Sequence, residues 1–352
     1  MLKNLINKFE NFIDSNKLKA KKRFNLFESF RIYPYSGFAN ENEVSLTGRV
    51  LEKEGILDDF QEAQSTFSKL KYMFRRYESD EIPFIKLRVT VEGNSVETTT
   101  TKEGFYHVKM PFDGKGKSGW HEAKIEVVDN PYTKQQKIEI TSKFIVASES
   151  SDYMIISDVD DTIIKSYATN TYLKVKTLLF KNVSARVAFE GVPDLYKKLQ
   201  ENPDGSMNPL FFVSGSSWNL YDLLDRFCEK HEIPEAPFFL RSMGIENNMF
   251  IQLKTRKFKM EKIMELFSFY PYLPAIFIGD SGQKDPEIYH QIAMENPDRV
   301  KAIFIRNITN KISEKRKKMI DELKQHDIDM VFIDHTKKIK QHLNDKELVD
   351  AL

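Results

Sequence analysis

Two aspartates stand two residues apart directly after a short apolar run. The run is Met154–Ser157, and the five residues that follow it, 158–162, read DVDDT. At a strand end this spacing points Asp158 and Asp160 to the same side, where their charges repel. Burying them needs a cation or a shared proton, and Mg²⁺, which prefers oxygen ligands, is the natural partner. One carboxylate could then act as nucleophile and the other as general acid and base; the alternative is a turn with solvated acids.

Two later apolar runs also end in groups that suit a phosphate or a metal ion. Residues 210–213 (LFFV) are followed by Ser214 and Gly215, whose hydroxyl and backbone N–H groups could hold a phosphate. Residues 275–278 (AIFI) are followed by a glycine and then Asp280, a third carboxylate at a strand end. Each of these residue pairs, taken by itself, is also common in ordinary turns.

A lysine just upstream of the third run could offset the charge of phosphate and carboxylates. Residues 257–263 read KFKMEKI and are predicted to begin a helix. Lys259 is the candidate, but Lys257 and Lys262 compete with it, so the sequence leaves open which lysine is catalytic.

In this order the DxDxT, serine, lysine and GDxxxxD elements resemble the signature of the haloacid-dehalogenase-like phosphohydrolases. The resemblance implies a nucleophile, a general acid/base, a closing threonine, a phosphate-holding hydroxyl and a phosphate-binding lysine: Asp158, Asp160, Thr162, Ser214 and Lys259. It implies Mg²⁺ as cofactor, with Asp158, Asp160 and Asp280 as ligands. Asp285, the second acid of the GDxxxxD loop, Gly215 and Arg241 are further candidates.

The residues around these motifs resemble a narrower group, the catalytic domain of the actin-patch-associated phosphatidate phosphatases and their bacterial relatives. Residues 213–224 (VSGSSWNLYDLL) and 278–289 (IGDSGQKDPEIY) carry the likeness, which covers 152–307. It implies Mg²⁺-dependent hydrolysis of phosphatidate to diacylglycerol through an aspartyl-phosphate on Asp158. One departure is Ser217, because the family usually has proline after the SGS.

Strand-like and helix-like segments alternate from residue 152 onward. This pattern predicts an α/β fold with a parallel sheet and helices on both faces, with ligands at the carboxyl ends of the strands. The resemblance implies that this sheet is Rossmann-like and of the haloacid-dehalogenase type. The expected strands include 153–157, 210–214, 275–279 and 300–306, and the expected helices include 192–200, 220–231, 259–267 and 286–295. The segment 165–191 is too short for a large lid, so we expect a small helical cap and an open site. Such a site suits a lipid headgroup and a phosphoprotein equally.

The chain before residue 152 is predicted to form two further segments. Short alternating runs separated by turn residues predict a β-sandwich-like domain over 31–147, interrupted by a helical stretch at 60–76. The alternating runs are 44–47, 85–91, 105–108 and 124–127. The predicted domains are therefore 1–30, 31–147 and 152–352.

Residues 1–30 are predicted to form an amphipathic basic helix. Over 1–24, seven basic and two acidic side chains give 7 − 2 = +5. Such a helix could lie on an anionic membrane surface, which would give peripheral membrane contact. The alternative is a helix docked on its own protein with a solvated basic flank.

Net charge and cysteine content exclude several classes of function. Lys+Arg 53 against Asp+Glu 52 gives a net charge of +1, so no nucleic-acid partner is expected. The single cysteine, Cys228, excludes a disulfide framework and a Cys-based zinc site. No export signal or membrane-spanning stretch is found, so we expect a cytoplasmic protein, with peripheral membrane contact through 1–24. The expected partner is a phosphorylated substrate, phosphatidate by the resemblance; a phosphatase for soluble phosphoesters or phosphoproteins and a non-catalytic interaction protein are the alternatives.

Overall fold

The computed structural model describes residues 30–52, 81–129, 138–164, 187–241, 248–308 and 312–349. Residues 1–29 of the predicted basic helix, the predicted helix at 60–76 and most of the predicted cap, 165–186, lie outside the described residues. The structure divides into two compact units, and each is described by itself. The first includes Ser45–Met110 and Glu122–Lys143, and the second includes Ser36–Val44, Pro111–His121 and the chain from Phe144 on.

The strands before residue 147 are joined in one mixed sheet. They are β1 (Phe30–Ala39), β2 (Glu43–Glu52), β3 (Lys86–Val91), β4 (Asn94–Thr99), β5 (Phe105–Pro111), β6 (Gly119–Asp129) and β7 (Glu139–Val146). Their order is β4-β3-β6-β7-β1-β2-β5. Strand β1 is parallel to β7, whereas β3 is antiparallel to β4 and β6. The four predicted runs lie in β2, β3, β5 and β6, which confirms the β-rich character; the two-layer sandwich stays a prediction.

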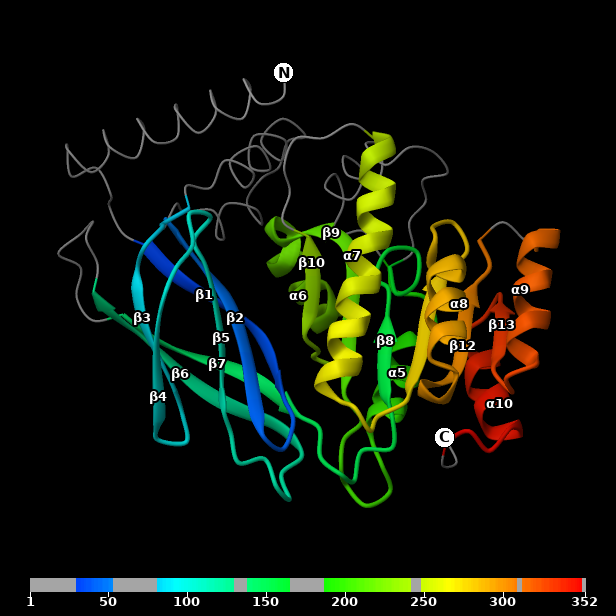
Figure 1. Cartoon of the computed structure of the whole chain (residues 1–352), viewed down its shortest axis with the longest axis horizontal. Coiled ribbons are helices and arrows are strands. Elements are labelled where there is room, and N and C mark those ends of the chain that lie inside the picture. The colour runs from blue at the N-terminus through cyan, green and yellow to red at the C-terminus, as the bar shows by residue number, and fades with distance from the viewer. Residues whose placement is uncertain are drawn as a thin grey trace. The chain divides into compact units, whose positions relative to one another are not determined.

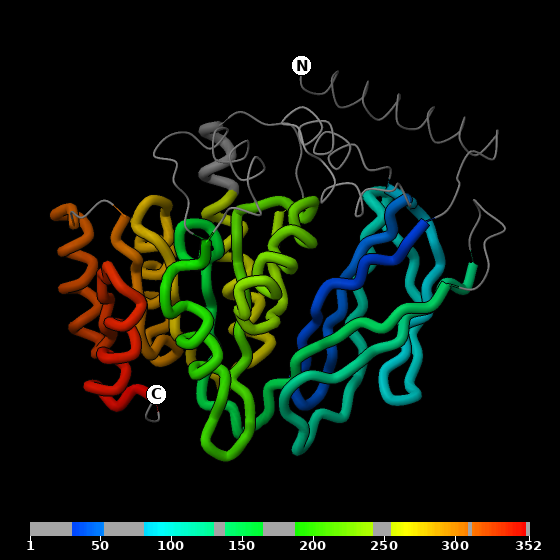
Figure 2. The backbone as a smooth tube through the Cα atoms, turned by 180° about the vertical axis from the view of Figure 1, so that it is seen from behind, coloured from blue at the N-terminus to red at the C-terminus, as the bar shows by residue number. Residues whose placement is uncertain are grey.

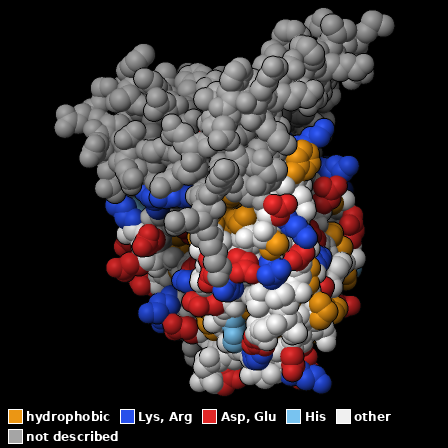
Figure 3. Space-filling model, turned by 90° about the vertical axis from the view of Figure 1, so that its left-hand side faces the viewer, with side chains coloured by type: hydrophobic (Ala, Val, Ile, Leu, Met, Phe, Trp, Pro, Cys, Tyr) orange, Lys and Arg blue, Asp and Glu red, His pale blue; other side chains and the backbone are white. Residues whose placement is uncertain are grey.

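Strand β3 shows why these residues form a half-buried sheet. Leu87, Val89 and Val91 alternate with Lys86, Arg88 and Thr90, and only the first three are buried. On the other face, ion pairs cross to the neighbouring strands, with Arg88 2.8 Å from Glu97 and 2.9 Å from Glu126. On the face shown in Figure 3, acidic and basic side chains are interspersed over the described atoms.

The chain from residue 154 alternates strands and helices, as predicted. The strands are β8 (Met154–Ser157), β9 (Leu210–Ser217), β10 (Phe238–Arg241), β11 (Ala275–Asp280), β12 (Val300–Arg306) and β13 (Asp329–Ile333). The helices are α5 (Val192–Gln200), α6 (Tyr221–Lys230), α7 (Asn248–Phe269), α8 (Asp285–Glu295), α9 (Glu314–Lys324) and α10 (Lys337–Asp345), with short 3-10 turns η2 (Trp218–Leu220) and η3 (Pro297–Arg299). Every described pairing in this sheet is parallel, which confirms the predicted α/β class.

Helices cover both faces of the parallel sheet. Helices α7, α8 and α9 lie on one face, and α5, α6 and α10 on the other (Figure 1). The view from behind in Figure 2 brings α5 and α10 to the front. Apolar side chains fill the layer under α7 and α8, where Ile263 and Leu266 pack against Phe277 and Ile288, all four fully buried or nearly so. Among the described residues, no helix is long and apolar enough to cross a membrane.

The strand order marks one place in the sheet for a ligand. Along the sheet the order is β10-β9-β8-β11-β12-β13. Numbered by their place in the chain, these strands read 3-2-1-4-5-6, the order of doubly wound sheets that bind ligands where the direction of winding reverses. That reversal lies between β8 and β11. Their carboxyl ends carry Asp158 and Asp280, so the two predicted motifs meet at the point that topology favours.

Candidate active site

Strand β8 holds Asp158 in the middle of the sheet. All four residues of the strand are buried, and it is hydrogen-bonded to β9 on one side and β11 on the other. The pairing continues past the strand end, where the Asp158 N–H donates to the Ile278 carbonyl at 2.9 Å. Asp158 itself is fully buried. Its carboxylate is therefore fixed by the sheet at the switch point.

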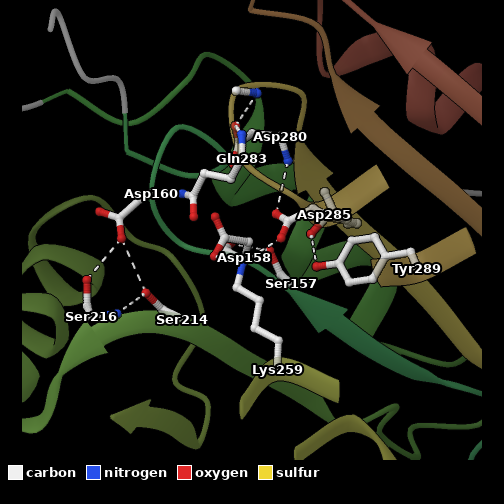
Figure 4. A network of polar contacts seen from close by, with 12 residues as sticks. Ser157, Asp158, Asp160, Ser214, Ser216, Lys259, Asp280, Gln283, Asp285 and Tyr289 are labelled. Atoms are coloured by element: carbon white, nitrogen blue, oxygen red, sulfur yellow. Dashed lines mark hydrogen bonds and ion pairs between the residues drawn. The ribbon is translucent and has the colours of Figure 1, made fainter. Parts of the chain in front are cut away.

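A buried lysine joins Asp158 to Asp285. The Lys259 ammonium of α7 lies 2.7 Å from Asp158 Oδ1 and 2.6 Å from Asp285 Oδ1. The three side chains are at most 1% exposed. Figure 4 shows Asp158 and Asp285 with Lys259 below them. The two carboxylates and the ammonium form one ionic cluster in the interior.

The structure distinguishes Lys259 from its two competitors. Lys257 is 77% exposed and lies 3.7 Å from Glu261, one turn along the same helix. Lys262 is 33% exposed and lies 2.7 Å from Glu265. Of the three lysines, Lys259 is the one that reaches the carboxylates at the strand ends.

Asp280 is held by the loop that follows β11. Its Oδ1 accepts the N–H groups of Gly282 at 2.6 Å and Gln283 at 3.0 Å. Its own N–H donates to Asp285 Oδ2 at 3.3 Å. Oδ2 of Asp280 is buried and has no hydrogen-bond partner among the residues that the structure describes. The GDxxxxD loop thus folds back on itself and leaves one carboxylate oxygen for another ligand.

Asp160 faces the end of β9. Its Oδ2 accepts the Ser214 hydroxyl at 3.2 Å and the Ser216 hydroxyl at 3.0 Å (Figure 4). Sequence reasoning named Ser214 and overlooked Ser216. The signal was available, because the i, i+2 rule that pairs Asp158 with Asp160 also puts the two serines of SGS on one side of a strand.

The remaining candidates lie around this centre. Thr162 is buried, and its hydroxyl has no hydrogen-bond partner in the described ranges of the chain. A side chain at Gly215 would meet Thr255, since a Cβ there would lie 2.7 Å from Thr255 Cγ2. Arg241, at the end of β10, donates to the Thr255 hydroxyl at 2.7 Å. Gly215 and Arg241 therefore share a neighbour beside Ser214.

Burial and like charges perturb the acids of the cluster. Burial raises the pKa of the Asp158 carboxyl well above its ordinary value; Lys259 opposes this shift, and Asp285 adds to it. Burial, then Asp285, raises the pKa of Asp280 in the same direction. Burial alone would lower the pKa of Lys259, but Asp158 and Asp285 outweigh it and raise that pKa. The lysine therefore stays protonated, and the acids resist ionisation without a further cation.

The cluster fits a divalent cation. Asp158, Asp280 and Asp285 each bring an oxygen atom within 4.8 Å of the others. Within the described part of the chain, the Oδ2 atoms of Asp158 and Asp280 are buried without a hydrogen-bond partner, which is costly unless something binds them. With all three acids ionised, three negative charges face one ammonium, so two remain, and a hard cation with oxygen ligands suits them. The carboxylate of Asp160 is not in this group and contacts the serines instead.

Comparison with known proteins agrees with the motifs. Residues 153–307 match the family described as phosphatidate phosphatase APP1, catalytic domain, which confirms the narrower resemblance for this part of the chain. Phosphatidate phosphatase APP1 of Saccharomyces cerevisiae is 29% identical over 160 residues, 46% of this chain and 27% of that protein. An uncharacterized protein of Schizosaccharomyces pombe is 29% identical over 157 residues, 44% of this chain and 25% of its own length. The chain thus spans only a minor part of each relative.

Solved structures are more distant. A chain of the Pnkp1/Rnl/Hen1 complex aligns with 51% of this chain and 57% of its own length, at 13% identity and a TM-score of 0.30. So low a score supports no statement about this protein.

Proposed function

We propose that this protein is a Mg²⁺-dependent phosphomonoester hydrolase of the haloacid-dehalogenase-like type that converts phosphatidate to diacylglycerol. One observation carries the proposal: within the residues that match the phosphatase family, a fully buried aspartate at a strand end pairs with a buried lysine at 2.7 Å. A nucleophilic carboxylate beside a fixed positive charge is the arrangement that transfer of a phosphoryl group needs.

In the first step the substrate's phosphoryl group moves to Asp158. A carboxylate oxygen of Asp158 forms a bond to phosphorus while the bond between phosphorus and the ester oxygen breaks. Asp160 gives its proton to the leaving oxygen, so that the alcohol departs neutral. The products of this step are diacylglycerol and an aspartyl-phosphate.

In the second step water releases the phosphate. The water oxygen forms a bond to phosphorus, and the bond from phosphorus to Asp158 breaks. Asp160, now a carboxylate, takes the proton that the water loses. Inorganic phosphate leaves, and both aspartates return to their starting states.

Positive charge and donors stabilise the transferring group. Lys259 and the Ser214 hydroxyl are the proposed donors to the equatorial oxygens, and loss of one such donor costs on the order of 10²–10³-fold in rate. A bound Mg²⁺ would offset the negative charge of the phosphate and the carboxylates. Asp158 and Asp280 would hold it, since each has a buried Oδ2 without a hydrogen-bond partner among the described residues. Asp160 as a further ligand stays a prediction.

The lipid substrate rests mainly on family likeness. One relative, from Saccharomyces cerevisiae, is a phosphatidate phosphatase. The predicted open site and the predicted basic N-terminal helix would suit a substrate held in a membrane. Peripheral membrane contact through 1–24 and a cytoplasmic location belong to the same proposal. A soluble phosphoester would use the same chemistry, so the test must separate the two.

The test is phosphate release from phosphatidate in mixed micelles, with and without Mg²⁺, beside a panel of soluble phosphomonoesters. We expect release from phosphatidate that needs Mg²⁺ and is abolished in Asp158→Asn. Asp152→Asn is the matched control, because this exposed aspartate stands just before β8 and leaves the cluster intact. Release from soluble esters alone would keep the chemistry and reject the lipid substrate. A wild type inactive on every substrate would reject the enzyme.

A further inference from the structure

Two serines of β9 share one oxygen atom of Asp160. We propose that Ser216 is a positioning residue, which holds Asp160 toward the leaving oxygen while Ser214 binds the phosphoryl group. The inference rests on the proposed phosphatase function and deepens it. It assigns a task to a hydroxyl that the sequence motif does not include.

The serines are linked to each other as well as to Asp160. The Ser216 N–H donates to Ser214 Oγ at 3.0 Å, and Ser214 Oγ donates in turn to Asp160 Oδ2 at 3.2 Å. The Ser216 hydroxyl reaches the same Oδ2 directly at 3.0 Å. Figure 4 shows these three contacts, two from serine hydroxyls to Asp160 and one from the Ser216 backbone to Ser214. Both hydroxyls are buried, with Ser214 fully so and Ser216 9% exposed.

One hydroxyl cannot serve two acceptors at once. Ser214 has a single proton, so when it donates to a phosphoryl oxygen it can no longer donate to Asp160. Among the described residues, these two serines are the side-chain donors to the Asp160 carboxylate. Ser216 is then the one that remains when substrate is bound. Without it, Asp160 loses its only side-chain anchor in that state, as far as the described part of the chain extends.

The position of Asp160 matters most when the leaving group is poor. An alkoxide leaves only if it is protonated as the ester bond breaks, and that proton comes from Asp160. A para-nitrophenolate leaves readily without it. A misplaced acid therefore slows alkyl esters and spares aryl esters, whereas general damage to the site slows both.

The experiment compares kcat/KM for hexyl phosphate and para-nitrophenyl phosphate in the wild type, Ser216→Ala and Ser216→Thr. The value of kcat/KM depends on the steps from substrate binding to departure of the leaving group. Hydrolysis of the aspartyl-phosphate therefore does not affect it. We expect Ser216→Ala to lose about tenfold more on hexyl phosphate than on para-nitrophenyl phosphate. Ser216→Thr, which keeps the hydroxyl, should recover most of that difference.

Ser217→Ala is the matched control. Its hydroxyl accepts the Asn219 N–H at 3.3 Å and caps η2. The change removes the same atom from the next residue without touching Asp160, so the ratio of the two substrates should not move. Equal losses of Ser216→Ala on both esters, or no loss, would overturn the inference. If the wild type releases phosphate from no substrate, the proposed function itself fails.

A crystal structure of Ser216→Ala with a phosphate analogue gives a readout that does not depend on which esters are hydrolysed. We expect the Asp160 carboxylate to have turned away from the end of β9. An unchanged Asp160 in that structure would contradict the assignment.

Discussion

At the scale of single residues, the interior cluster of Asp158, Lys259 and Asp285 is tolerable only because its charges offset one another. All three side chains are at most 1% exposed, so water screens none of them. Removing one partner of a buried ion pair leaves an uncompensated charge, which costs more than the pair itself contributes. Burial raises the free-energy cost of these charges. It also strengthens their electrostatic effect on the reacting group, because little water screens it.

We predict that Lys259→Met destabilises the protein by about 3–5 kcal/mol and lowers kcat on the order of 10²–10³-fold. Two buried carboxylates would then face each other without the ammonium. Lys262→Met is the matched control on the same helix, since Lys262 is 33% exposed, and it should change stability by less than about 0.5 kcal/mol. Urea denaturation and phosphate release measure both effects. Equal stability of the two variants would contradict the ionic cluster.

The raised carboxyl pKa values make stability depend on pH. Burial raises the pKa of Asp158 and Asp280 above the ordinary value of 3.8. The folded protein thus holds these protons more tightly than the unfolded chain does. Their contribution to the free energy of unfolding is present below pH 3.8 and is lost as pH rises through the raised values. A bound cation opposes this loss, because its ligands must be ionised.

We therefore predict that Mg²⁺ raises Tm more at about pH 8 than at about pH 5, where protons compete for the same oxygens. At 100 times its Kd, Mg²⁺ would add about 2.7 kcal/mol, or roughly 5–10 °C in Tm. Asp280→Asn should abolish the rise, and Asp298→Asn, a change at an exposed aspartate, should keep it. A rise that is larger at the lower pH would contradict this arrangement of carboxylates.

The sequence predicted the two acids of this cluster because Asp158 directly follows an apolar run and Asp285 stands in the loop after another. It could not choose among the three lysines, since helical periodicity does not say how far a side chain reaches across to another strand. The contacts of the Asp160 carboxylate with Ser214 and Ser216 were not predicted either, and its role as a metal ligand stays a prediction. The direction of a side chain after a strand end depends on the turn, and Asp161 there has φ 56, which no alternation pattern encodes.

At the scale of elements, buried strands and amphipathic helices were the easiest to predict. Helix α5 and strand β12 have the bounds expected from their patterns, 192–200 and 300–306. Helix α7 is longer than expected, because it begins at Asn248. Strand β10, only Phe238–Arg241, and β4, which is mostly exposed, lack a long apolar pattern and were not predicted. Their strand form comes from pairing with β9 and β3.

At Gly279, near the end of β11, the neighbouring side chains leave no space for a Cβ atom. A Cβ there would lie 2.7 Å from Tyr289 Cε2 and 2.8 Å from Asp285 Oδ2. We predict that Gly279→Ala costs about 1–3 kcal/mol and lowers kcat, because it pushes Asp285 away from Lys259. Chemical denaturation and steady-state kinetics are the measurements.

Gly205→Ala is the control for a loss of stability at a glycine outside the active site. Gly205 has φ +83, and no atom of the described residues lies within 4 Å of the point that a Cβ would occupy. Alanine at this position makes no clash with the described residues, and only its positive φ lowers the free energy of unfolding, by about 1 kcal/mol. Its kcat should equal that of the wild type. A Gly279→Ala variant with full kcat would contradict the close packing at the site.

At the scale of the whole molecule, the unit that carries the site draws on the chain before residue 144. It includes Ser36–Val44, and Phe38 of that stretch is 6% exposed in its core. The Phe38 ring lies 4.8 Å from Phe269 and 5.8 Å from Phe211, measured between centroids. The predicted boundary at residue 152 stays a prediction, but a fragment cut there would lack this ring. Periodicity along the chain cannot reveal such a contribution, because it comes from a residue far away in sequence.

We predict that Phe38→Ala in the full chain lowers the free energy of unfolding by about 3–5 kcal/mol and leaves kcat of the folded protein unchanged. The ring fills the core and touches no group of the site. Phe84→Ala is the matched control, because Phe84 is 51% exposed and its loss should cost less than about 0.5 kcal/mol. Equal melting temperatures for the two variants would show that Phe38 is not part of the core.

The central claim is that Asp158 becomes phosphorylated during turnover. The most direct measurement is to stop the reaction with acid while the wild type hydrolyses phosphatidate, reduce the acyl-phosphate with borohydride and sequence the peptides by mass spectrometry. We predict homoserine in place of aspartate at position 158 and at no other aspartate. Turnover that leaves Asp158 unmodified, or places the modification on Asp160 or Asp280, would contradict the account.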